Sequence, residues 1–259
     1  MTNSAWRTEQ RHTILELWKE AVATSPDTVF LHFLNDNEKY TYAEFDALSN
    51  RLAQGLLSSG IASGDRIATL LDSHADSVAL LIAASKVNAV YVPVNTANKG
   101  EFLRNPLANS GARVLVSEAQ YLERVAAIRE GLPDLQTIYI RGESSAGATA
   151  GELFAQLYSD NSADTDICPD PGDIAGIIYT GGTTGPSKGC ILSQNYIANQ
   201  ALRTREMCDP RLGEVNWTCL PLFHLNAIVV TLLYSVVSGT TAAITPRFSL
   251  SGFWADIEK

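Results

Sequence analysis

The chain has 259 residues, 46% of them hydrophobic, so it can bury a large core as one domain or as two lobes. Its formal net charge is −9, which leaves no basic field to neutralise nucleic-acid phosphates. The composition therefore argues against a nucleic-acid partner, and any anion site must be locally positive or rich in N–H donors.

The first 140 residues alternate between helical and extended patterns. We expect an amphipathic helix over residues 13–24 and a strand pair at 29–34 and 39–41. Thr41 and Glu44 have the spacing of a capping box that starts a second helix. Further elements are expected at 66–71 (strand), 76–86 (helix), 89–94 (strand), 99–109 (helix), 113–116 (strand), 118–130 (helix) and 137–140 (strand). Apolar strands alternating with helices predict an α/β fold with a largely parallel sheet covered on both faces.

Two polar stretches interrupt this pattern. Residues 141–150 are rich in Gly, Ser and Ala, which predicts a loop, and residues 159–173 carry five aspartates and two prolines. We therefore expect a first α/β lobe over 1–158, an acidic linker over 159–173 and a second, incomplete lobe over 174–259. The second lobe should contain a helix from Ser193 to about Met207 and strands at 215–220 and 241–244.

Residues 174–190 carry the most informative pattern in the chain. An apolar, strand-like stretch leads into a run rich in glycine and hydroxyl side chains with one lysine. Glycines let backbone N–H groups approach anionic oxygens, hydroxyls add donors and lysine adds a positive charge, so this run predicts a polyphosphate-binding loop. It is not a Walker loop, because Ser187 precedes Lys188 and Gly189 follows it. The candidate phosphate-binding residues are Thr180, Gly181, Gly182, Thr183, Thr184, Gly185, Pro186, Ser187 and Lys188.

The order of residue types from Tyr179 to Gly189 resembles the phosphate loop of the adenylate-forming, AMP-binding superfamily. That family comprises acyl-CoA synthetases, peptide-synthetase adenylation domains and luciferases. The chain is also similar to the opening of acyl-CoA synthetases, of the carnitine-CoA ligase-like or short/medium-chain kind, at 40–45, 50–53, 64–68 and 90–95. The resemblance extends from about residue 13 to residue 259.

The resemblance implies the N-terminal portion of the acyl-CoA synthetase-like fold, with two lobes whose largely parallel sheets are flanked by helices. Two positions depart from the family pattern. Asn88 stands where glycine is usual, and Ser187 stands where proline is common. Neither change removes a phosphate donor.

His224, in the segment 219–227, lies between a predicted strand end and a predicted helix start. An isolated histidine there would be interpreted as hydrogen-bonded and inert. Because the loop lies upstream at a family-like distance, the functional interpretation is favoured, and the resemblance implies that His224 lies against the reacting carboxylate. An imidazole can donate to a carboxylate oxygen and titrates near neutrality.

The resemblance implies ATP-dependent activation of a carboxylic acid to an acyl-adenylate, followed by thioesterification to coenzyme A. Residues 180–188 would hold the β- and γ-phosphates, Lys188 would offset charge on the departing pyrophosphate, and the Thr180 hydroxyl would help to ligate Mg²⁺. Lys188 and His224 are the candidate catalytic residues. Peptide-synthetase domains usually have an aspartate after the phenylalanine that corresponds to Phe223, to pair with the α-ammonium of their substrates. His224 in that place favours an acid without an α-amino group.

The last residues, 249–259, have the pattern of a helix without a glycine cap. In the resembled family the polypeptide is longer, and its remainder supplies an acidic Mg²⁺ ligand, an aspartate for the ribose and a mobile C-terminal domain with a lysine. We therefore expect the N-terminal portion of such an enzyme, inactive alone, with the C-terminal domain absent. Two alternatives stay open: a non-catalytic nucleotide-binding or interaction fragment, and an adenylation enzyme with another acceptor. A homodimer is one option for its assembly.

The cysteines at 168, 190, 208 and 219 lack the short paired spacing of a zinc site, and reduced thiols are expected. The first residues have no apolar core of a signal peptide. The most apolar segment, 227–237, is shorter than the roughly 20 residues that span a bilayer, so it should be a buried helix or strand. We expect a soluble cytoplasmic protein without a transmembrane segment.

Overall fold

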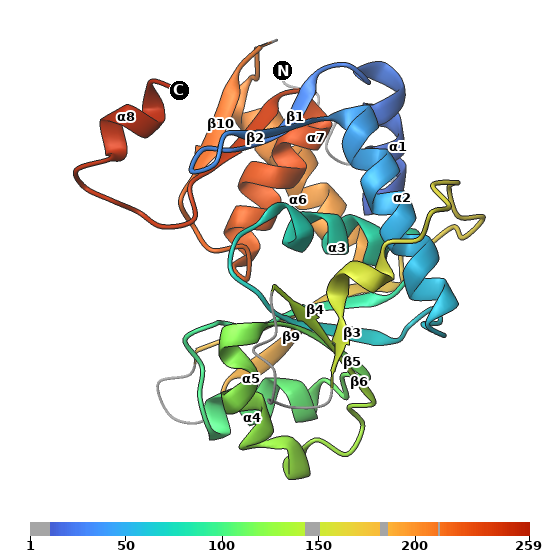
Figure 1. The fold of residues 1–259 in the computed structure, drawn as a ribbon. Coiled ribbons are helices and arrows are strands. Elements are labelled where there is room, and N and C mark those ends of the chain that lie inside the picture. The colour runs from blue at the N-terminus through green and yellow to red at the C-terminus, as the bar shows by residue number, and fades with distance from the viewer. Residues whose placement is uncertain (1–10, 143–150, 182–185, 212) are drawn as a thin grey trace, which may run out of the picture.

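The computed structural model describes residues 11–142, 151–181, 186–211 and 213–259, which form two β-sheets with helices between and beside them (Figure 1). The strands are β1 (Val29–Phe33), β2 (Glu38–Thr41), β3 (Arg66–Leu70), β4 (Val90–Pro93), β5 (Val114–Glu118), β6 (Thr137–Arg141), β7 (Glu152–Leu153), β8 (Ile174–Thr180), β9 (Lys188–Ser193), β10 (Val215–Thr218) and β11 (Thr241–Ile244). The α-helices are α1 (Ile14–Thr24), α2 (Tyr42–Ser58), α3 (Ala75–Lys86), α4 (Glu101–Asn109), α5 (Leu122–Ala126), α6 (Gln194–Cys208), α7 (Tyr234–Ser238) and α8 (Phe253–Ile257).

Both sheets are largely parallel. The larger has the order β7-β6-β5-β3-β4-β8-β9, and β9 is its one antiparallel strand among the described residues. The smaller has the order β10-β11-β1-β2, with β2 antiparallel. The predicted α/β class with largely parallel sheets is confirmed.

The elements stack in four layers. Helices α1, α2, α3, α6 and α7 lie between the two sheets, and α4 and α5 cover the outer face of the larger sheet (Figure 1). Successive side chains of β3 point to opposite faces of the larger sheet and so enter two separate hydrophobic cores. Ile67 points into the core of the central helical layer, and Ala68 points into the core under α4 and α5. The larger sheet is therefore buried on both faces, as expected for parallel strands.

Local chemistry fixes where several elements begin and end. The Thr41 hydroxyl accepts from the Glu44 N–H at 3.2 Å, and the Glu44 carboxylate accepts from the Thr41 N–H at 2.8 Å, which confirms the predicted capping box of α2. Asn88, after α3, has φ = 52°. Asparagine tolerates this left-handed conformation better than most residues, which explains how it replaces the glycine usual in the resembled family.

Three local predictions were incomplete. The helix expected at 118–130 starts later than predicted, because Glu118 stays in the β5–β6 ladder opposite Arg141. The chain beyond β5 instead forms the short α5, flanked by 3₁₀ turns at Ala119–Tyr121 and Arg129–Gly131. Strands β7 and β9 were not predicted. The apolar segment left open as helix or strand is helical: a π-helix over Ala227–Leu233 continues into α7.

The two sheets do not follow the chain division expected at residues 159–173. Strand β8, which comes after that segment, pairs with β4 in the larger sheet, and β11 pairs with β1 in the smaller one. The segment itself packs on the helical layer, where the buried Thr165 hydroxyl donates to the Lys86 carbonyl at 2.6 Å and the Ser159 carbonyl accepts from Arg51 Nε at 2.7 Å. Neither sheet is therefore built from the predicted 1–158 lobe alone or from the 174–259 lobe alone. The boundaries of independently folding units stay a prediction.

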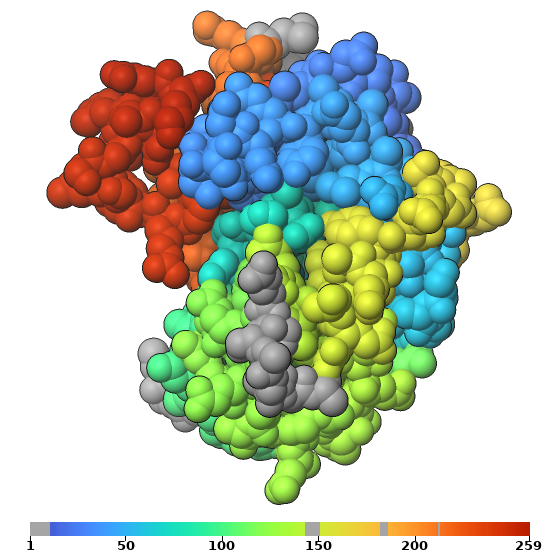
Figure 2. Space-filling view, in the orientation of Figure 1, coloured from blue at the N-terminus to red at the C-terminus, as the bar shows by residue number. Residues whose placement is uncertain are grey.

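The last residues stand out from the body of the molecule (red in Figure 2). Their helix is confined to α8, and three of their apolar side chains are largely exposed: Phe248 (58%), Leu250 (83%) and Trp254 (71%). No helix in the described ranges has the length and apolar character needed to cross a membrane.

Candidate active site

The carboxyl ends of β4 and β8 lie side by side in the larger sheet. Tyr91 and Gly176 are register partners, and the two strands end at Pro93 and Thr180. A Cβ on Gly176 would lie 3.0 Å from the Tyr91 carbonyl oxygen, so glycine lets the strands approach. Ligands of open α/β sheets bind beyond this carboxyl edge.

The predicted phosphate loop is the connection of a β-hairpin. Thr180 in β8 and Lys188 in β9 are register partners, so the two ends of the loop are adjacent. Thr180, Gly181, Pro186 and Lys188 are exposed, and Ser187 is half-buried. The remaining predicted phosphate-binding residues, Gly182, Thr183, Thr184 and Gly185, lie outside the described residues. Within the described part of the chain, no carboxylate lies within ion-pair distance of the Lys188 ammonium.

Tight packing holds the base of the hairpin. A Cβ on Gly189 would lie 2.8 Å from Ile177 Cγ2 and 3.1 Å from the Tyr179 ring, so a larger residue would displace that ring. The Tyr179 hydroxyl donates to Asn109 Oδ1 at 2.7 Å. Burial raises the pKa of the Tyr179 phenol, so it stays protonated and keeps this donor.

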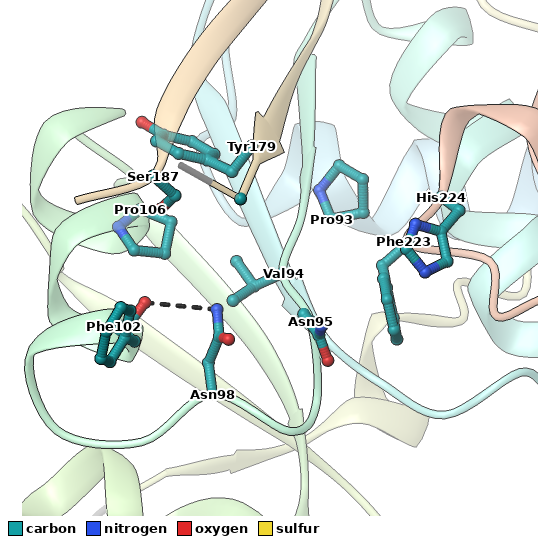
Figure 3. A pocket seen from close by; sticks show the side chains of 11 residues that line it. Pro93, Val94, Asn95, Asn98, Phe102, Pro106, Tyr179, Ser187, Phe223 and His224 are labelled. Atoms are coloured by element: carbon teal, nitrogen blue, oxygen red, sulfur yellow. Dashed lines mark hydrogen bonds between the residues drawn. The ribbon is translucent and has the colours of Figure 1, made fainter. Parts of the chain in front are cut away.

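A cavity of about 180 Å³ opens beside the hairpin (Figure 3). Tyr179 and Ser187 line one side and Phe223 and His224 line the other. Of the described loop residues, Gly181 and Ser187 line this cavity, whereas Thr180, Pro186 and Lys188 do not. The fold thus brings the described ends of the loop and His224, which are well separated in sequence, to one space.

His224 precedes the helical segment that ends with α7. Its N–H donates to the Pro221 carbonyl at 3.0 Å, its side chain is exposed, and its ring centroid lies 4.6 Å from that of Phe223. The Leu222 N–H donates to the buried Ser73 Oγ at 3.2 Å, which ties this segment to the turn after β3. The predicted position between a strand and a helix is confirmed.

The rest of the cavity wall was missed by the sequence analysis. It comes from the loop after β4 and from the first turns of α4, where Asn98 Nδ2 donates to the Phe102 carbonyl at 3.2 Å (Figure 3). The signal was present, because a strand was predicted up to Val94 and the residues after such a strand meet those after its neighbour. The missed residues are Pro93, Val94, Asn95, Asn98, Phe102 and Pro106.

A second polar cluster lies at the carboxyl ends of β5 and β6. Arg141 Nε lies 2.7 Å from Asp76 Oδ2, Arg141 Nη1 lies 3.3 Å from Glu118 Oε1, and the Tyr158 hydroxyl donates to Asp76 Oδ1 at 2.6 Å. Burial raises the pKa of Glu118. Burial alone would also raise the pKa of Asp76, but hydrogen bonds from His74, Tyr158 and Arg141 and the charge of Arg141 outweigh it and hold that pKa well below its usual range. These groups satisfy one another, which indicates a structural cluster.

The four cysteines are free thiols, and Cys168, Cys190 and Cys208 are exposed.

Comparison with known proteins covers nearly the whole chain. This chain is 30% identical to the long-chain-fatty-acid–CoA ligase FadD13 of Mycobacterium tuberculosis, and the match covers 98% of this chain and 47% of that protein. It is 27% identical to the crotonobetaine/carnitine–CoA ligase of Salmonella paratyphi A over 94% of this chain and 48% of that protein. The chain thus spans about half the length of the curated relatives it matches.

Among solved structures, the inhibitor-bound N-terminal domain of FACL13 from Mycobacterium tuberculosis superposes with a TM-score of 0.84 at 27% identity, over 95% of this chain and 60% of that one. This likeness supports the predicted N-terminal portion of the fold. Residues 18–259 match the family described as AMP-binding enzyme. With that match over most of its length, the chain belongs to the AMP-binding enzyme family.

Proposed function

We propose that the protein carrying this chain uses ATP to convert a carboxylic acid to an acyl-adenylate and then transfers the acyl group to coenzyme A. The observation that carries the proposal is the single cavity bordered by Gly181 and Ser187 of the loop on one side and by His224 on the other. Family membership and relatives named as acid–CoA ligases support it.

In the first step a carboxylate oxygen attacks the α-phosphorus of ATP and pyrophosphate leaves. In the second, the thiol of coenzyme A attacks the acyl carbonyl and AMP leaves. Such transfers need little covalent help from protein, so positioning and charge neutralisation are the tasks of the chain. The exposed Lys188 ammonium binds phosphate oxygens and offsets charge on the leaving pyrophosphate. His224 donates a hydrogen bond to the carboxylate as its charge moves toward phosphorus.

Magnesium fits the residues present. The exposed Thr180 hydroxyl at the end of β8 offers one hard oxygen donor, which suits an ion that keeps several waters and binds mainly to substrate phosphates. The ion would neutralise phosphate charge. The remaining predicted loop residues, except Pro186, which has no N–H, would contribute backbone donors to the phosphates.

The proposed substrate class is a carboxylic acid without an α-amino group. His224 provides no counter-charge for an ammonium, and the cavity wall includes the apolar side chains of Val94, Phe102, Pro106 and Phe223. Relatives named as ligases of long-chain fatty acids and of crotonobetaine or carnitine agree with this class, and fatty acid metabolism is the proposed setting. The cytoplasmic location and the homodimer stay predictions from the sequence.

The test is exchange of labelled pyrophosphate into ATP, followed by an assay for acyl-CoA. Both use the 259-residue chain and, beside it, the longest natural polypeptide that carries it. We expect the longer protein to exchange only with a suitable acid, such as a fatty acid or carnitine, and the short chain not to complete the reaction. Exchange that depends on an amino acid, or that needs no acid, would overturn the proposal.

The same assays separate the two alternatives. Nucleotide binding without exchange by the longer protein would favour a non-catalytic binding module. Exchange that is never followed by acyl-CoA would favour an adenylation enzyme with another acceptor.

A further inference from the structure

Helix α4 contacts the hairpin on both sides of the predicted phosphate loop. Asn105 Nδ2 donates to the Ser187 carbonyl at 2.7 Å and lies 3.2 Å from the Ser187 hydroxyl. One helical turn later, Asn109 Oδ1 accepts from the Tyr179 hydroxyl at 2.7 Å. Tyr179 directly precedes Thr180, and Ser187 directly precedes Lys188. The two asparagines therefore hold the two flanks of the loop.

The helix is a firm support for these contacts. Leu103 and Leu107 are at most 2% exposed and pack in the core on the outer face of the larger sheet. Side chains at i and i+4 lie on one face of a helix, so Asn105 and Asn109 face the hairpin together. Sites hold their geometry best when they are supported by rigid, packed elements.

The hydrogen bond from Asn105 holds Ser187 in place where the pairing of β8 with β9 does not reach. The last register pair of the hairpin is Thr180 with Lys188, so Ser187 lies just beyond the β8–β9 ladder. In the described part of the chain, the Asn105 amide is the group that fixes the Ser187 carbonyl. Because Ser187 adjoins Lys188, movement of this carbonyl moves the lysine backbone as well.

We propose that Asn105 is a positioning residue for nucleotide activation. Its amide N–H group fixes the position of the Ser187 carbonyl. Because Lys188 follows Ser187 directly, the same hydrogen bond fixes the position of Lys188 relative to Tyr179 on the opposite flank of the loop. Asn105 acts through the protein backbone and is not among the residues that line the cavity. The inference rests on the proposed function and assigns to α4 the support of the phosphate loop.

The experiment compares Asn105→Leu and Asn105→Ala with the unsubstituted protein in acid-dependent pyrophosphate exchange, using the longest natural polypeptide that carries the chain. Leucine keeps the side-chain size and removes the donor, and alanine covers the case in which leucine does not fold. We expect kcat/KM for ATP to fall about 5- to 10-fold, as for the loss of one hydrogen bond, while KM for the acid changes less than about twofold.

A control variant separates positioning from general destabilisation. Asn199→Leu removes an asparagine of α6 whose Nδ2 donates to the Asn195 carbonyl at 2.9 Å and which does not line the cavity, so it should leave both kinetic constants unchanged.

The outcomes are distinct. Normal ATP kinetics in both Asn105 variants, or equal loss for ATP and for the acid, would overturn the positioning role while leaving the proposed function standing. If the unsubstituted protein shows no acid-dependent exchange, the proposed function and this inference both fail.

Discussion

The Lys86 ammonium, whose side chain is fully buried, lies 2.6 Å from the Asp46 carboxylate. Asp46 comes from α2 and Lys86 ends α3, so the pair joins two helices of the central layer. The Trp18 indole N–H of α1 donates to the same Asp46 oxygen at 2.7 Å, and Asn50 Nδ2 donates to the other at 3.1 Å. Three helices therefore meet at one carboxylate.

Asp46→Ala should destabilise the fold by about 3–5 kcal/mol, because it leaves a buried ammonium without its partner. Adding Lys86→Met should recover a substantial part of the loss, since the unpaired charge disappears. Denaturant unfolding of the two single variants and the double variant measures this coupling. A loss below about 1 kcal/mol in Asp46→Ala would mean that Asp164, 3.9 Å from Lys86, serves as the partner instead.

Lys188→Ala should slow adenylation by roughly 10- to 150-fold while stability stays near that of the parent, because one charge-assisted contact is lost from an exposed side chain. Pyrophosphate exchange and thermal unfolding measure the two effects. Lys39→Ala, an exposed lysine of β2 in the other sheet, is the matched control and should change neither. Unchanged exchange in Lys188→Ala, or failure to fold, would contradict the assigned role.

His224→Ala should lower turnover by about 10-fold or more and alter the preferred acid, while affinity for ATP stays near normal. The imidazole lines the cavity on the side opposite the loop, so nucleotide binding alone should not sense its loss. Calorimetric titration with ATP and exchange across a panel of acids measure this, with His12→Ala as a control outside the cavity. Loss of ATP binding with an unchanged acid preference would place His224 on the nucleotide side.

Asp76→Asn should cost about 1–3 kcal/mol at pH 7, because it removes a carboxylate that accepts charge-assisted bonds from Arg141 and Tyr158. The pKa of Asp76 is lower in the folded than in the unfolded chain, so its contribution is fully present above the unfolded value of about 4. The contribution is lost as the pH falls below that value toward the folded pKa.

Denaturant unfolding of parent and Asp76→Asn between about pH 7 and pH 3.5 tests this dependence. The difference between the two proteins should shrink only at the acidic end. Asp160→Asn, an exposed aspartate, should stay within about 0.5 kcal/mol of the parent throughout. A difference that grows on acidification would reverse the sign of the linkage.

Local sequence chemistry predicted those parts of the fold that depend on neighbours in the chain. The Thr41–Glu44 cap needs four residues, and the alternation of strands and helices follows from hydrophobic periodicity. The sequence also placed His224 ahead of a helix and joined it to the loop through the family pattern. Both His224 and the described loop residues Gly181 and Ser187 line one cavity, which supports that grouping.

The parts that were missed depend on distant partners. Strand β9 begins at Lys188 directly after a glycine-rich run, so the composition suggested a loop while pairing with β8 makes a strand. Pairing of β1 with β11 cannot be inferred from periodicity, which carries no information about which strand lies next to which. For the same reason, the sequence could not predict the contact between Asn105 and Ser187, which are 82 positions apart.

Pairing between Leu31 and Ala242 also determines when the smaller sheet can form during synthesis. The two residues are 211 positions apart. At ribosomal rates of about 5–20 residues per second, β11 is therefore synthesised roughly 10–40 s after β1. Strands β3, β4, β5 and β6 are complete by Arg141 and can assemble while the rest is still being translated. Until β11 emerges, the edge of β1 that pairs with it stays unpaired, so the smaller sheet should be completed after the larger one, whose last strand ends at Ser193.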